Sequence, residues 1–542
     1  MSRQVATLSS TATLCGTTPA SMIGGSDQHA RLAAARAAGA HAFVAELPEG
    51  YHTPVGHGGV VLTASQRLRL VVAGMIAADP PVIVVDDPTA GLDRTGETAV
   101  LPGLESLLRG REVRVLRASP AVRAAITRAR SAPQGTPPPP PILARLPEDP
   151  GLPSLSRLLD ASEMAPLLGG LLGGQCVDVR VHSTRYKPGD NIVVEYGVLT
   201  PSGWSTAVAY AHAGSKLPRK LKNPGHRKLA RRVADRVPAA RPFVLLPEVS
   251  ALVQWMPLDV RLPVLADDAQ RLTARLAKKG ILVSAAEPEL LRYWPRRRAV
   301  LRFGPYVLKL YREPGDFDQA HRNLRASASL QQLRTPGYKG KLKGRQVTVQ
   351  EWIPGGAPSL APASSDPAGA ILADLHGATS PALRTTTPEA LLAKAASRAD
   401  FVVHLLPVLR REVAALLDDL EAKAPHGGPL VTSHGNFHAG QLLADPVLGM
   451  AMIDFDRLCL ASPAYDVSSF AAHVAFGRPG DRAVVSAAID SLVAGYGARP
   501  VDLEWYLSIA LLRRAAVPFR FQDEHWPDAV AELVDHARAV LP

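Results

Sequence analysis

A run of five consecutive prolines, Pro137–Pro141, constrains the fold of this chain more than any other feature. Prolines in series favour an extended polyproline II segment, and they cannot continue a helix or a central strand. The surrounding residues 131–155 are therefore expected to form a linker. Because 542 residues exceed one ordinary domain, we expect several folded units around it, with the boundaries 1–130, 156–282, 283–356 and 357–542.

Composition indicates globular units in a reducing compartment. Hydrophobic residues make up 46% and charged residues 20% of the chain, which allows each unit to bury a core. The three cysteines, Cys15, Cys176 and Cys459, are far apart, and the histidines show no zinc-site spacing. No apolar stretch approaches the roughly 20 residues that cross a bilayer. We therefore expect a cytoplasmic protein without a disulfide framework, a zinc site or a transmembrane segment.

The net charge of +12 indicates an acidic partner. The basic tract Lys216–Arg232 carries eight Lys or Arg residues and no acid. It is either a solvated loop and helix face or a contact surface for anionic lipid head groups, an acidic peptide or RNA. No aromatic residue lies within the tract to stack on bases, which argues against single-stranded nucleic acid. Further positive charge lies at Arg296–Arg298, beside the predicted nucleotide-binding lobe, so phosphate is favoured over nucleic acid as the target.

Two segments 107 residues apart share one pattern. In Arg185–Tyr196 and in Arg292–Phe303, a turn with proline precedes a strand of alternating β-branched or aromatic residues. A second strand follows each segment, at Ser205–His212 and at Tyr306–Arg312. The pattern predicts two similar antiparallel-sheet units, and the alternative is two unrelated hairpins.

The segment Gly355–Pro367 is rich in Pro, Ala, Gly and Ser and is expected to be a loop that joins two lobes. Beyond it, apolar residues recur at helical spacing, notably in Pro388–Ala422 and Arg482–Tyr496. The last part of the chain is therefore predicted to be helical.

Residues 42–127 carry short motifs in a fixed order. Leu62–Arg67 has the sequence Leu-Thr-Ala-Ser-Gln-Arg, Asp79–Asp87 is an apolar strand that ends in two aspartates, and Gly91–Asp93 follows it. The series resembles the signature motif, the Walker B strand and the D-loop of the nucleotide-binding domain of ABC exporters. The resemblance implies a partial α/β ATPase-like domain over residues 1–130.

This N-terminal region lacks the parts that hydrolyse ATP. No Gly-x-x-x-x-Gly-Lys-[Ser/Thr] loop, whose amides and lysine hold phosphates, occurs anywhere in the chain. Ala64 and Ser65 replace the two signature glycines, Asp87 stands at the position of the catalytic glutamate, and Ala118 at that of the switch histidine. We therefore expect a remnant kept for its fold, or a docking surface, without ATPase activity of its own.

Two short apolar strands flank a polar loop in the C-terminal region. The segment Val431–Leu443 contains His434-Gly435-Asn436-Phe437-His438, and Met452–Asp456 has the sequence Met-Ile-Asp-Phe-Asp. Phosphoryl transfer needs one group that orients the acceptor hydroxyl and oxygen ligands for the cation on the ATP phosphates. The pattern resembles the aminoglycoside phosphotransferase and choline kinase family over roughly residues 290–542. The resemblance implies an α+β, protein-kinase-like two-lobed fold, with an antiparallel-sheet N-lobe and a helical C-lobe.

The resemblance assigns roles to single positions. His434 opens the catalytic loop, Asp454 is the metal ligand, and Asp466 matches a later aspartate of the helical lobe. Two positions depart from the family, because Asn436 replaces the catalytic aspartate and Gln441 replaces the metal-binding asparagine. Gln441 keeps a carbonyl oxygen, so Asp454 and Gln441 are the predicted magnesium ligands.

The replacement by Asn436 affects catalysis directly. An amide orients a hydroxyl but cannot take its proton, and loss of a general base typically costs about 10²–10⁴ in rate. The catalytic side of the predicted site contains Asn436, His434 and His438. His438 or Asp456 are the candidates for a substitute base.

Nucleotide-binding residues are predicted in the small lobe. Lys309 occupies the strand position that pairs with phosphates, whereas the first copy of the repeat, at Ala207–Tyr210, has no lysine. Glu351 and Trp352 lie in a segment that resembles the hinge whose backbone binds adenine. The following helix, Phe317–Gln332, should supply a glutamate to pair with the lysine but contains none; Asn323 lies near that place. ATP and Mg²⁺ are the implied cofactors.

The sequence therefore predicts an ATP- and Mg²⁺-dependent phosphotransferase that acts on the hydroxyl of a small metabolite or a peptide. One alternative is a pseudokinase, a nucleotide-sensing or scaffolding protein that has lost efficient transfer. The other is a subunit associated with an ABC transporter through the N-terminal region. Neither the acceptor nor the oligomeric state follows from the sequence.

Overall fold

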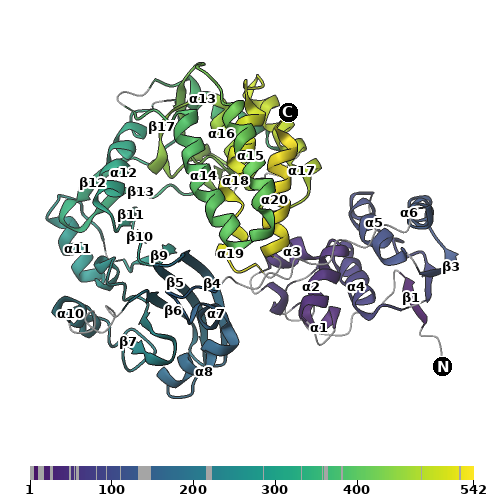
Figure 1. Ribbon diagram of the computed structural model, residues 1–542, viewed down its shortest axis with the longest axis horizontal. Coiled ribbons are helices and arrows are strands. Elements are labelled where there is room, and N and C mark those ends of the chain that lie inside the picture. The colour runs from purple at the N-terminus through teal and green to yellow at the C-terminus, as the bar shows by residue number, and fades with distance from the viewer. Residues whose placement is uncertain are drawn as a thin grey trace. The chain divides into compact units, whose positions relative to one another are not determined.

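The chain divides into two compact units, Met1–Pro141 and Ile142–Pro542, each described here by itself (Figure 1). The computed structural model describes residues 5–131 and 148–541, apart from residues 10–17, 25–27, 48–49, 54, 56–59, 61, 81, 93, 110, 215–222, 285, 331, 357, 359–363, 380–382, 478 and 524–525. The proline run and residues 216–222 of the basic tract therefore lie outside the described residues. The finer domain boundaries given above stay predictions.

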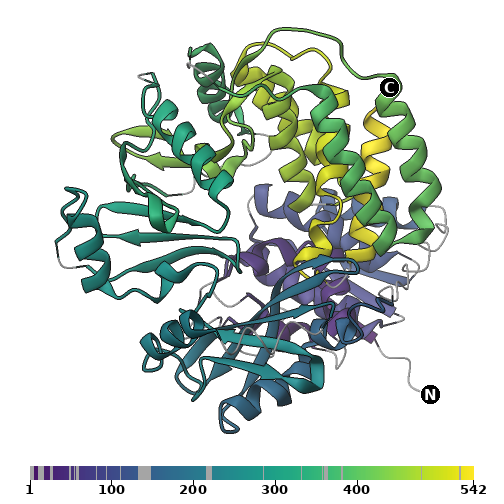
Figure 2. The ribbon, with the colours of Figure 1, turned by 60° about the vertical axis from the view of Figure 1, so that its left-hand side comes forward.

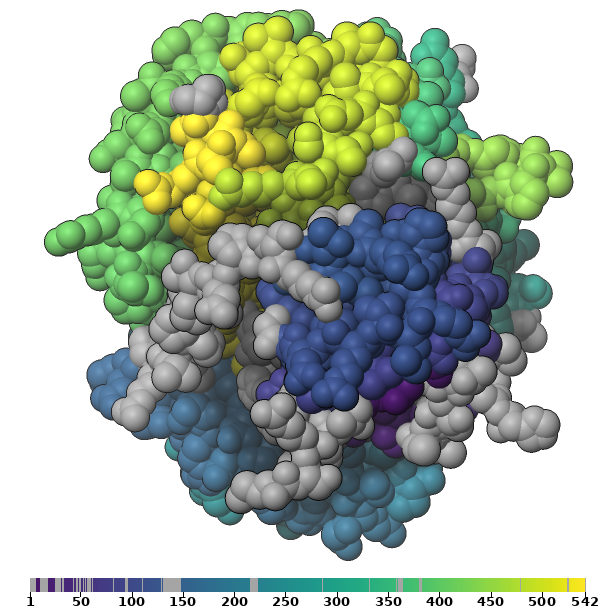
Figure 3. Space-filling model, turned by 90° about the vertical axis from the view of Figure 1, so that its right-hand side faces the viewer, coloured from purple at the N-terminus to yellow at the C-terminus, as the bar shows by residue number. Residues whose placement is uncertain are grey.

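The N-terminal unit is built on a parallel three-stranded sheet in the order β1-β2-β3. Its strands are β1 (Val5–Ser9), β2 (Val82–Asp86) and β3 (Glu112–Arg117). The helices are α1 (Pro19–Ile23), α2 (Gln28–Ala37), α3 (His41–Glu46), α4 (Ala64–Ala78), α5 (Arg94–Leu108) and α6 (Pro120–Ser131), with the 3₁₀ turn η1 (Gly50–His52). Figure 3 shows the surface that residues 100–130 of this unit form, drawn in blue.

The motif residues of this unit have structural partners. Thr63 begins α4 with a capping box, because its hydroxyl accepts the Gln66 N–H while the Gln66 side chain accepts the Thr63 N–H. The Walker B-like Asp86, at the end of β2, pairs with Arg117 at 2.6 Å. The signature-like segment is thus a capped helix start, and Asp86 is held by an arginine of the neighbouring strand.

The C-terminal unit contains two five-stranded antiparallel sheets with the same strand order. The first, ordered β4-β5-β6-β8-β7, contains β4 (Asp178–Lys187), β5 (Asn191–Thr200), β6 (Gly203–His212), β7 (Phe243–Leu246) and β8 (Ala251–Trp255). The second, ordered β9-β10-β11-β13-β12, contains β9 (Glu289–Trp294), β10 (Arg298–Phe303), β11 (Tyr306–Tyr311), β12 (Tyr338–Leu342) and β13 (Val347–Glu351). In each, a helix lies between the third and fourth strands: α10 (Pro224–Arg232) and α12 (Pro314–Ser327). The predicted pair of similar sheet units is therefore confirmed in the topology.

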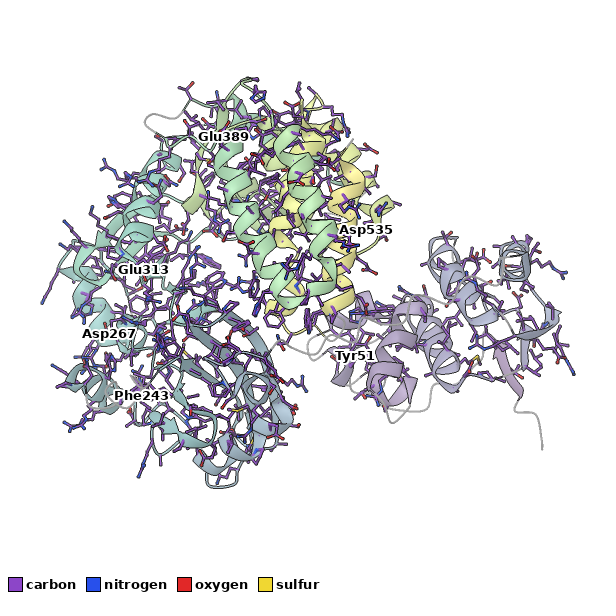
Figure 4. The ribbon with its side chains drawn as sticks, viewed as in Figure 1. Tyr51, Phe243, Asp267, Glu313, Glu389 and Asp535 are labelled. Carbon is purple, nitrogen blue, oxygen red and sulfur yellow. The ribbon has the colours of Figure 1, made fainter. Side chains whose placement is uncertain are left out.

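Short helices accompany the two sheets. α7 (Leu155–Leu159), α8 (Ala161–Leu171) and the 3₁₀ turn η2 (Pro247–Val249) share a core with the first sheet, whereas the 3₁₀ turn η3 (Pro263–Ala266) and α11 (Ala269–Ala277) pack against the second. Asp267, labelled in Figure 4, is buried and accepts from Arg232 of α10 at 2.7 Å and from Arg275 of α11 at 2.6 Å. One arginine of the basic tract is therefore part of a buried ion pair that joins two helices, rather than of a free surface.

The two sheets differ at the lysine position. Lys309 pairs with Val300 across β10 and β11, and the corresponding pair in the first sheet is Val193 and Tyr210. The guanidinium of Arg296, from the turn before β10, lies 3.9 Å from the centroid of the Tyr210 ring. The first sheet thus carries an arginine-covered aromatic ring where the second carries a lysine.

The remainder is helical (Figure 2). Its helices are α13 (Asp366–Gly377), α14 (Pro388–Leu405), α15 (Arg410–Ala422), α16 (Pro463–Gly477), α17 (Arg482–Tyr496), α18 (Leu503–Arg514), α19 (Val517–Arg520) and α20 (Trp526–Val540). The predicted helical stretch Pro388–Ala422 is two helices, because Pro407 follows α14 and starts the 3₁₀ turn η6 (Pro407–Leu409). The predicted helix at Phe317–Gln332 starts earlier, at Pro314, and ends at Ser327.

Two short antiparallel strand pairs, an inner hairpin and an outer pair that encloses it in the chain, lie between α15 and α16 and carry the candidate site; together they are called the hairpins. β14 (Val431–Ser433) pairs with β17 (Cys459–Ala461), and β15 (Leu442–Asp445) pairs with β16 (Gly449–Met452). The 3₁₀ turns η7 (Ala439–Gln441) and η8 (Phe455–Arg457) connect them. Across the described parts of both units, no helix combines the length and apolar character needed to cross a membrane.

Candidate active site

Two carboxylates and two cations meet where the second sheet faces the hairpins. The Nζ atom of Lys309, on β11, lies 2.5 Å from Oδ1 of Asp454 and 2.8 Å from Oδ1 of Asp456. The guanidinium of Arg298, the first residue of β10, lies 2.8 Å from Oδ1 of Asp454 and 3.1 Å from Oδ2 of Asp456. The structure therefore brings the predicted lysine and the predicted metal ligand into direct contact.

The cluster is largely buried, and its two positive charges equal its two negative charges in number. The Lys309 side chain is 6% exposed and that of Asp454 is 23% exposed. Burial by itself raises the pKa of Asp454, but the positive charges of Lys309 and Arg298 outweigh it and hold this pKa well below its ordinary value. The hydroxyl of Tyr311 donates to Oδ2 of Asp456 at 2.8 Å, and burial followed by the charge of Asp456 raises the pKa of Tyr311, so it stays a donor.

Tyr311 was missed by the sequence prediction, and Arg298 was predicted only as part of the basic turn Arg296–Arg298, although each left a signal for its place in the site. Tyr311 lies two residues after Lys309 on the same strand, and alternate residues of a strand share one face. Arg298 ends the three-arginine turn Arg296–Arg298, which precedes the strand next to that of the lysine. Their partners could not be assigned without the fold.

Helix α12 contributes an amide instead of a glutamate. The side-chain amide of Asn323 donates to the backbone carbonyls of Asp456 and Leu458, each at 3.0 Å. It therefore fixes the backbone beyond Asp454, and the partners of Lys309 are the two aspartates.

A buried aspartate shapes the loop that opens with His434. Asp466, on α16, accepts from the backbone N–H groups of His434 at 2.6 Å and Gly435 at 2.9 Å and lies 3.2 Å from Nε2 of His376. Burial alone raises the pKa of Asp466, but these partners hold it below its ordinary value. Gly435 has φ 79°, and a Cβ there would lie 2.2 Å from the carbonyl oxygen of Arg457, so only glycine fits.

The two histidines of the loop have structural contacts. His434 is fully buried, and its Nε2 lies 2.9 Å from the carbonyl oxygen of Ile453. The His438 ring stacks on that of His473 with a centroid distance of 4.0 Å, and its Nδ1 accepts the Gly440 N–H. Burial, followed by repulsion from His473, lowers the pKa of His438 to about 3, so the ring is neutral at pH 7 and a weak proton acceptor.

Asn436 and Gln441 differ in how their amides are used. Asn436 is partly exposed, and its side chain has no hydrogen-bond partner among the residues that the structure describes. The Gln441 side chain is 8% exposed and lies 3.0 Å from Nε2 of His438. The Asn436 amide is therefore available to a ligand, whereas that of Gln441 is engaged locally.

The oxygen atoms of Asp454 fit a magnesium ion in one respect. Oδ1 of Asp454 accepts both cationic partners, while Oδ2 has no partner in the described part of the chain. Magnesium prefers carboxylate and carbonyl oxygens and usually keeps waters and substrate phosphates as its other ligands. The described residues hold no group of three His, Cys, Asp or Glu side chains placed for a metal. One open carboxylate oxygen is compatible with a cation that is held largely by a nucleotide.

The predicted hinge residues use their backbone amides within the protein. The Glu351 N–H donates to Gly337 at 2.9 Å, the Trp352 N–H donates to Pro305 at 2.8 Å, and the Glu351 carboxylate pairs with Lys339 at 2.6 Å. Within the described residues the N–H of Ile353, one position later, has no backbone or side-chain acceptor. Of the three, it is the amide that an adenine ring could use.

Comparison with known proteins finds a family match in the part of the chain that carries this site. Residues 292–505 match the phosphotransferase enzyme family. The resemblance to phosphotransferases is therefore confirmed, and so is the α+β, protein-kinase-like fold of an antiparallel sheet followed by a helical lobe.

Solved structures similar to this chain include a spectinomycin phosphotransferase in complex with ADP and spectinomycin. It is 17% identical and covers 51% of this chain and 98% of its own, with a TM-score of 0.37. A choline/ethanolamine kinase family protein from Mesorhizobium loti is 16% identical and covers 50% of this chain and 94% of its own, with a TM-score of 0.36.

Curated relatives match the N-terminal region of the chain, and they include an ABC transporter. ABC transporter B family member 19 of Arabidopsis thaliana is 46% identical over 78 residues, 14% of this chain and 6% of the relative. The ATP-dependent lipid A-core flippase of Alkalilimnicola ehrlichii is 43% identical over 84 residues, 16% of this chain and 14% of the relative. The chain thus spans only a small part of these relatives. The resemblance of the N-terminal region to an ABC nucleotide-binding domain is confirmed.

Proposed function

We propose that the C-terminal unit transfers the γ-phosphoryl group of ATP, in the presence of Mg²⁺, to a hydroxyl of a small metabolite or a peptide. The observation that carries this proposal is the buried cluster of Lys309, Arg298, Asp454 and Asp456. Phosphates need cationic side chains, and the magnesium ion that accompanies them needs carboxylate ligands; this cluster holds both kinds of group away from solvent. We also propose a cytoplasmic location, where ATP is available.

Each residue has a role that its contacts support. Lys309 and Arg298 turn from the aspartates to the phosphates when a nucleotide enters. Asp454, with Gln441 as the second candidate ligand, would hold Mg²⁺, which supplies charge neutralisation on the phosphates. The hinge residues Glu351 and Trp352 position the adenine, with the N–H of Ile353 as its donor.

Asn436 limits the rate. Its free amide hydrogen-bonds the acceptor hydroxyl and orients it, but it cannot accept the proton. His438 is a weak substitute, because its pKa lies near 3. A loose phosphoryl-transfer transition state depends mainly on positioning and charge stabilisation, so slow transfer persists without a strong base.

The test measures ATP consumption by the purified chain with pools of hydroxylated metabolites and Mg²⁺. We expect slow turnover in the wild type, a rise of about 10² in kcat for Asn436→Asp, and no turnover for Asp454→Ala. Asp418→Ala, an exposed aspartate on α15, is the matched control. Equal rates for Asp454→Ala and Asp418→Ala would contradict the proposal.

One observation favours the pseudokinase alternative. Lys309 contacts both aspartates, and α12 offers it no glutamate, so the nucleotide must displace existing ion pairs. A nucleotide-binding scaffold would bind ATP and show no turnover even with Asn436→Asp. The N-terminal unit is proposed to be a remnant kept for its fold or for docking to ABC-type machinery, since it has no P-loop.

A further inference from the structure

A cavity of about 170 Å³ lies beside the candidate site, within the C-terminal unit. It is lined by β4 of the first sheet, by the turn between β9 and β10 of the second sheet, and by α14, α18 and α19. Figure 1 shows α14 and α19 next to the ends of β4 and β5, and α19 packs against β4. A single water needs roughly 10–15 Å³ on this scale, so the cavity admits a small metabolite.

The lining is basic and contains no acid among the described residues. Its charged side chains are five arginines from five different elements or turns: Arg185, Arg297, Arg398, Arg513 and Arg520. In the described part of the chain none of the five forms an ion pair with a carboxylate. Two acids stand behind the lining, where Glu195 accepts from Ser183 at 2.7 Å and Asp149 accepts from Tyr186 at 2.7 Å. The face that a ligand meets is therefore uniformly positive.

These arginines repel one another in a poorly hydrated space. Burial, followed by the charge of Arg297, lowers the pKa of Arg185 to about 10. Burial, followed by the charges of Arg297 and Arg398, lowers the pKa of Arg520, while Glu195 acts in the opposite direction. The aromatic walls, Trp294, Phe401 and Phe519, exclude water and strengthen these interactions. A folded protein keeps such repulsion where a ligand offsets it, so the cluster points to an anion.

The cavity is linked to the charge cluster of the candidate active site through the turn that precedes β10. Arg297 is the neighbour of Arg298, which pairs with Asp454. The carbonyl oxygen of Arg457 occupies the place where a Cβ on Gly435 would lie. Burial, and to a lesser degree the charges of Arg513 and Arg297, lower the pKa of Arg457, while Asp454 acts in the opposite direction. A ligand held by the arginines is therefore placed near the loop that carries Asn436.

We propose that this cavity binds the acceptor substrate, and that the acceptor is a small hydroxylated metabolite bearing a phosphate or a similar multivalent anionic group. The arginines hold the anionic group, while the hydroxyl reaches Asn436. The assignment to an acceptor rests on the proposed function, but the anion site itself does not. The phosphates of ATP are the competing source of the same chemistry, and the experiment separates the two.

The experiment titrates glycerol 3-phosphate, and glycerol as its neutral parent, into the full chain by calorimetry at constant ionic strength. Titrations are made with and without a saturating non-hydrolysable ATP analogue and Mg²⁺. We expect glycerol 3-phosphate, but not glycerol, to bind the nucleotide-loaded protein. Arg520→Gln and Arg513→Gln should each weaken that binding about tenfold or more, since each removes charge-assisted hydrogen bonds. Arg411→Ala, an exposed arginine on α15, should leave it unchanged.

A second readout separates lost binding from a damaged fold. Because each arginine is repelled by the others, Arg520→Gln and Arg513→Gln should melt at or above the wild-type temperature in buffer without multivalent anions. Both should lose the stabilisation that glycerol 3-phosphate gives the wild type. Variants that melt lower and keep the full stabilisation would overturn the proposal.

The remaining outcomes are distinct. No binding of glycerol 3-phosphate, or equal binding in all variants, would overturn the anion site while leaving ATP binding, and the proposed function, intact. Competition between glycerol 3-phosphate and the ATP analogue, with both weakened by the arginine variants, would assign the cavity to the nucleotide and overturn the acceptor role. Anion binding without ATP binding would support the cavity and contradict the proposed function.

Discussion

The buried charge cluster predicts a strong energetic coupling between Lys309 and Asp454. Their charged atoms are 2.5 Å apart, and their side chains are 6% and 23% exposed. Removing one partner of a buried ion pair costs about 3–5 kcal/mol, because the other charge is left unpaired. Here Asp456 still contacts Lys309, and Arg298 still contacts Asp454, so we expect about 2–3 kcal/mol for Lys309→Met or Asp454→Asn alone.

The double variant restores charge balance. It leaves Arg298 paired with Asp456 at 3.1 Å, one cation with one anion. Its cost should therefore be close to that of a single variant, which corresponds to a coupling of about 2 kcal/mol between the two sites.

Urea denaturation followed by tryptophan fluorescence measures these free energies of unfolding. All six tryptophans lie between residues 204 and 526, so the signal reports on the C-terminal unit alone. The exposed pair Lys279→Met and Asp418→Asn is the control, for which each change should stay within about 0.5 kcal/mol. Single costs of Lys309→Met and Asp454→Asn that add within about 0.5 kcal/mol would refute the reasoning.

Three further predictions concern single positions. The pKa of Asp454 is depressed in the folded protein, so the stability that its charge contributes is fully present above its unfolded pKa of about 3.9 and is lost as pH falls through the folded value. The difference in unfolding free energy between wild type and Asp454→Asn should therefore shrink only below about pH 4. A difference that is constant down to about pH 2 would contradict this. Gly435→Ala should cost about 2–4 kcal/mol in urea denaturation because its Cβ collides with the Arg457 carbonyl, whereas Gly315→Ala, whose Cβ meets nothing, should be near neutral. Asp86→Ala should leave ATP consumption at the wild-type rate, because the unit that contains it has no P-loop; a loss of turnover would show that the N-terminal unit is active.

Much of the fold follows from patterns that are local in sequence. The Arg-Tyr-x-Pro turns and the alternating strands after them indicated two sheets, and the helix over Arg482–Tyr496 was predicted with its observed bounds. Pro407 was inside a stretch predicted to be continuous, and it divides that stretch into α14 and α15. The motif residues Lys309 and Asp454 were predicted because the short segments around them resemble the corresponding motifs of the phosphotransferase family.

The partners of these residues could not be predicted, because they come from distant positions. Arg298 and Asp454 are 156 residues apart, and only the packing of the second sheet against the hairpins brings them together. The arginine cavity was even harder to predict, since its five arginines come from both sheet units and three helices. The sequence indicated positive charge in Lys216–Arg232 and at Arg296–Arg298. Arg297 of the second group lines the cavity, whereas Arg232 of the first group pairs with the buried Asp267.

The central claim is that the second sheet and the hairpins form a nucleotide site, and calorimetric titration with ATP and Mg²⁺ tests it most directly. We predict binding to the wild type and to Lys279→Met, and binding at least about tenfold weaker to Lys309→Met, because the lysine makes a charge-assisted contact with phosphate. No binding to the wild type, or equal binding to all three proteins, would contradict the account.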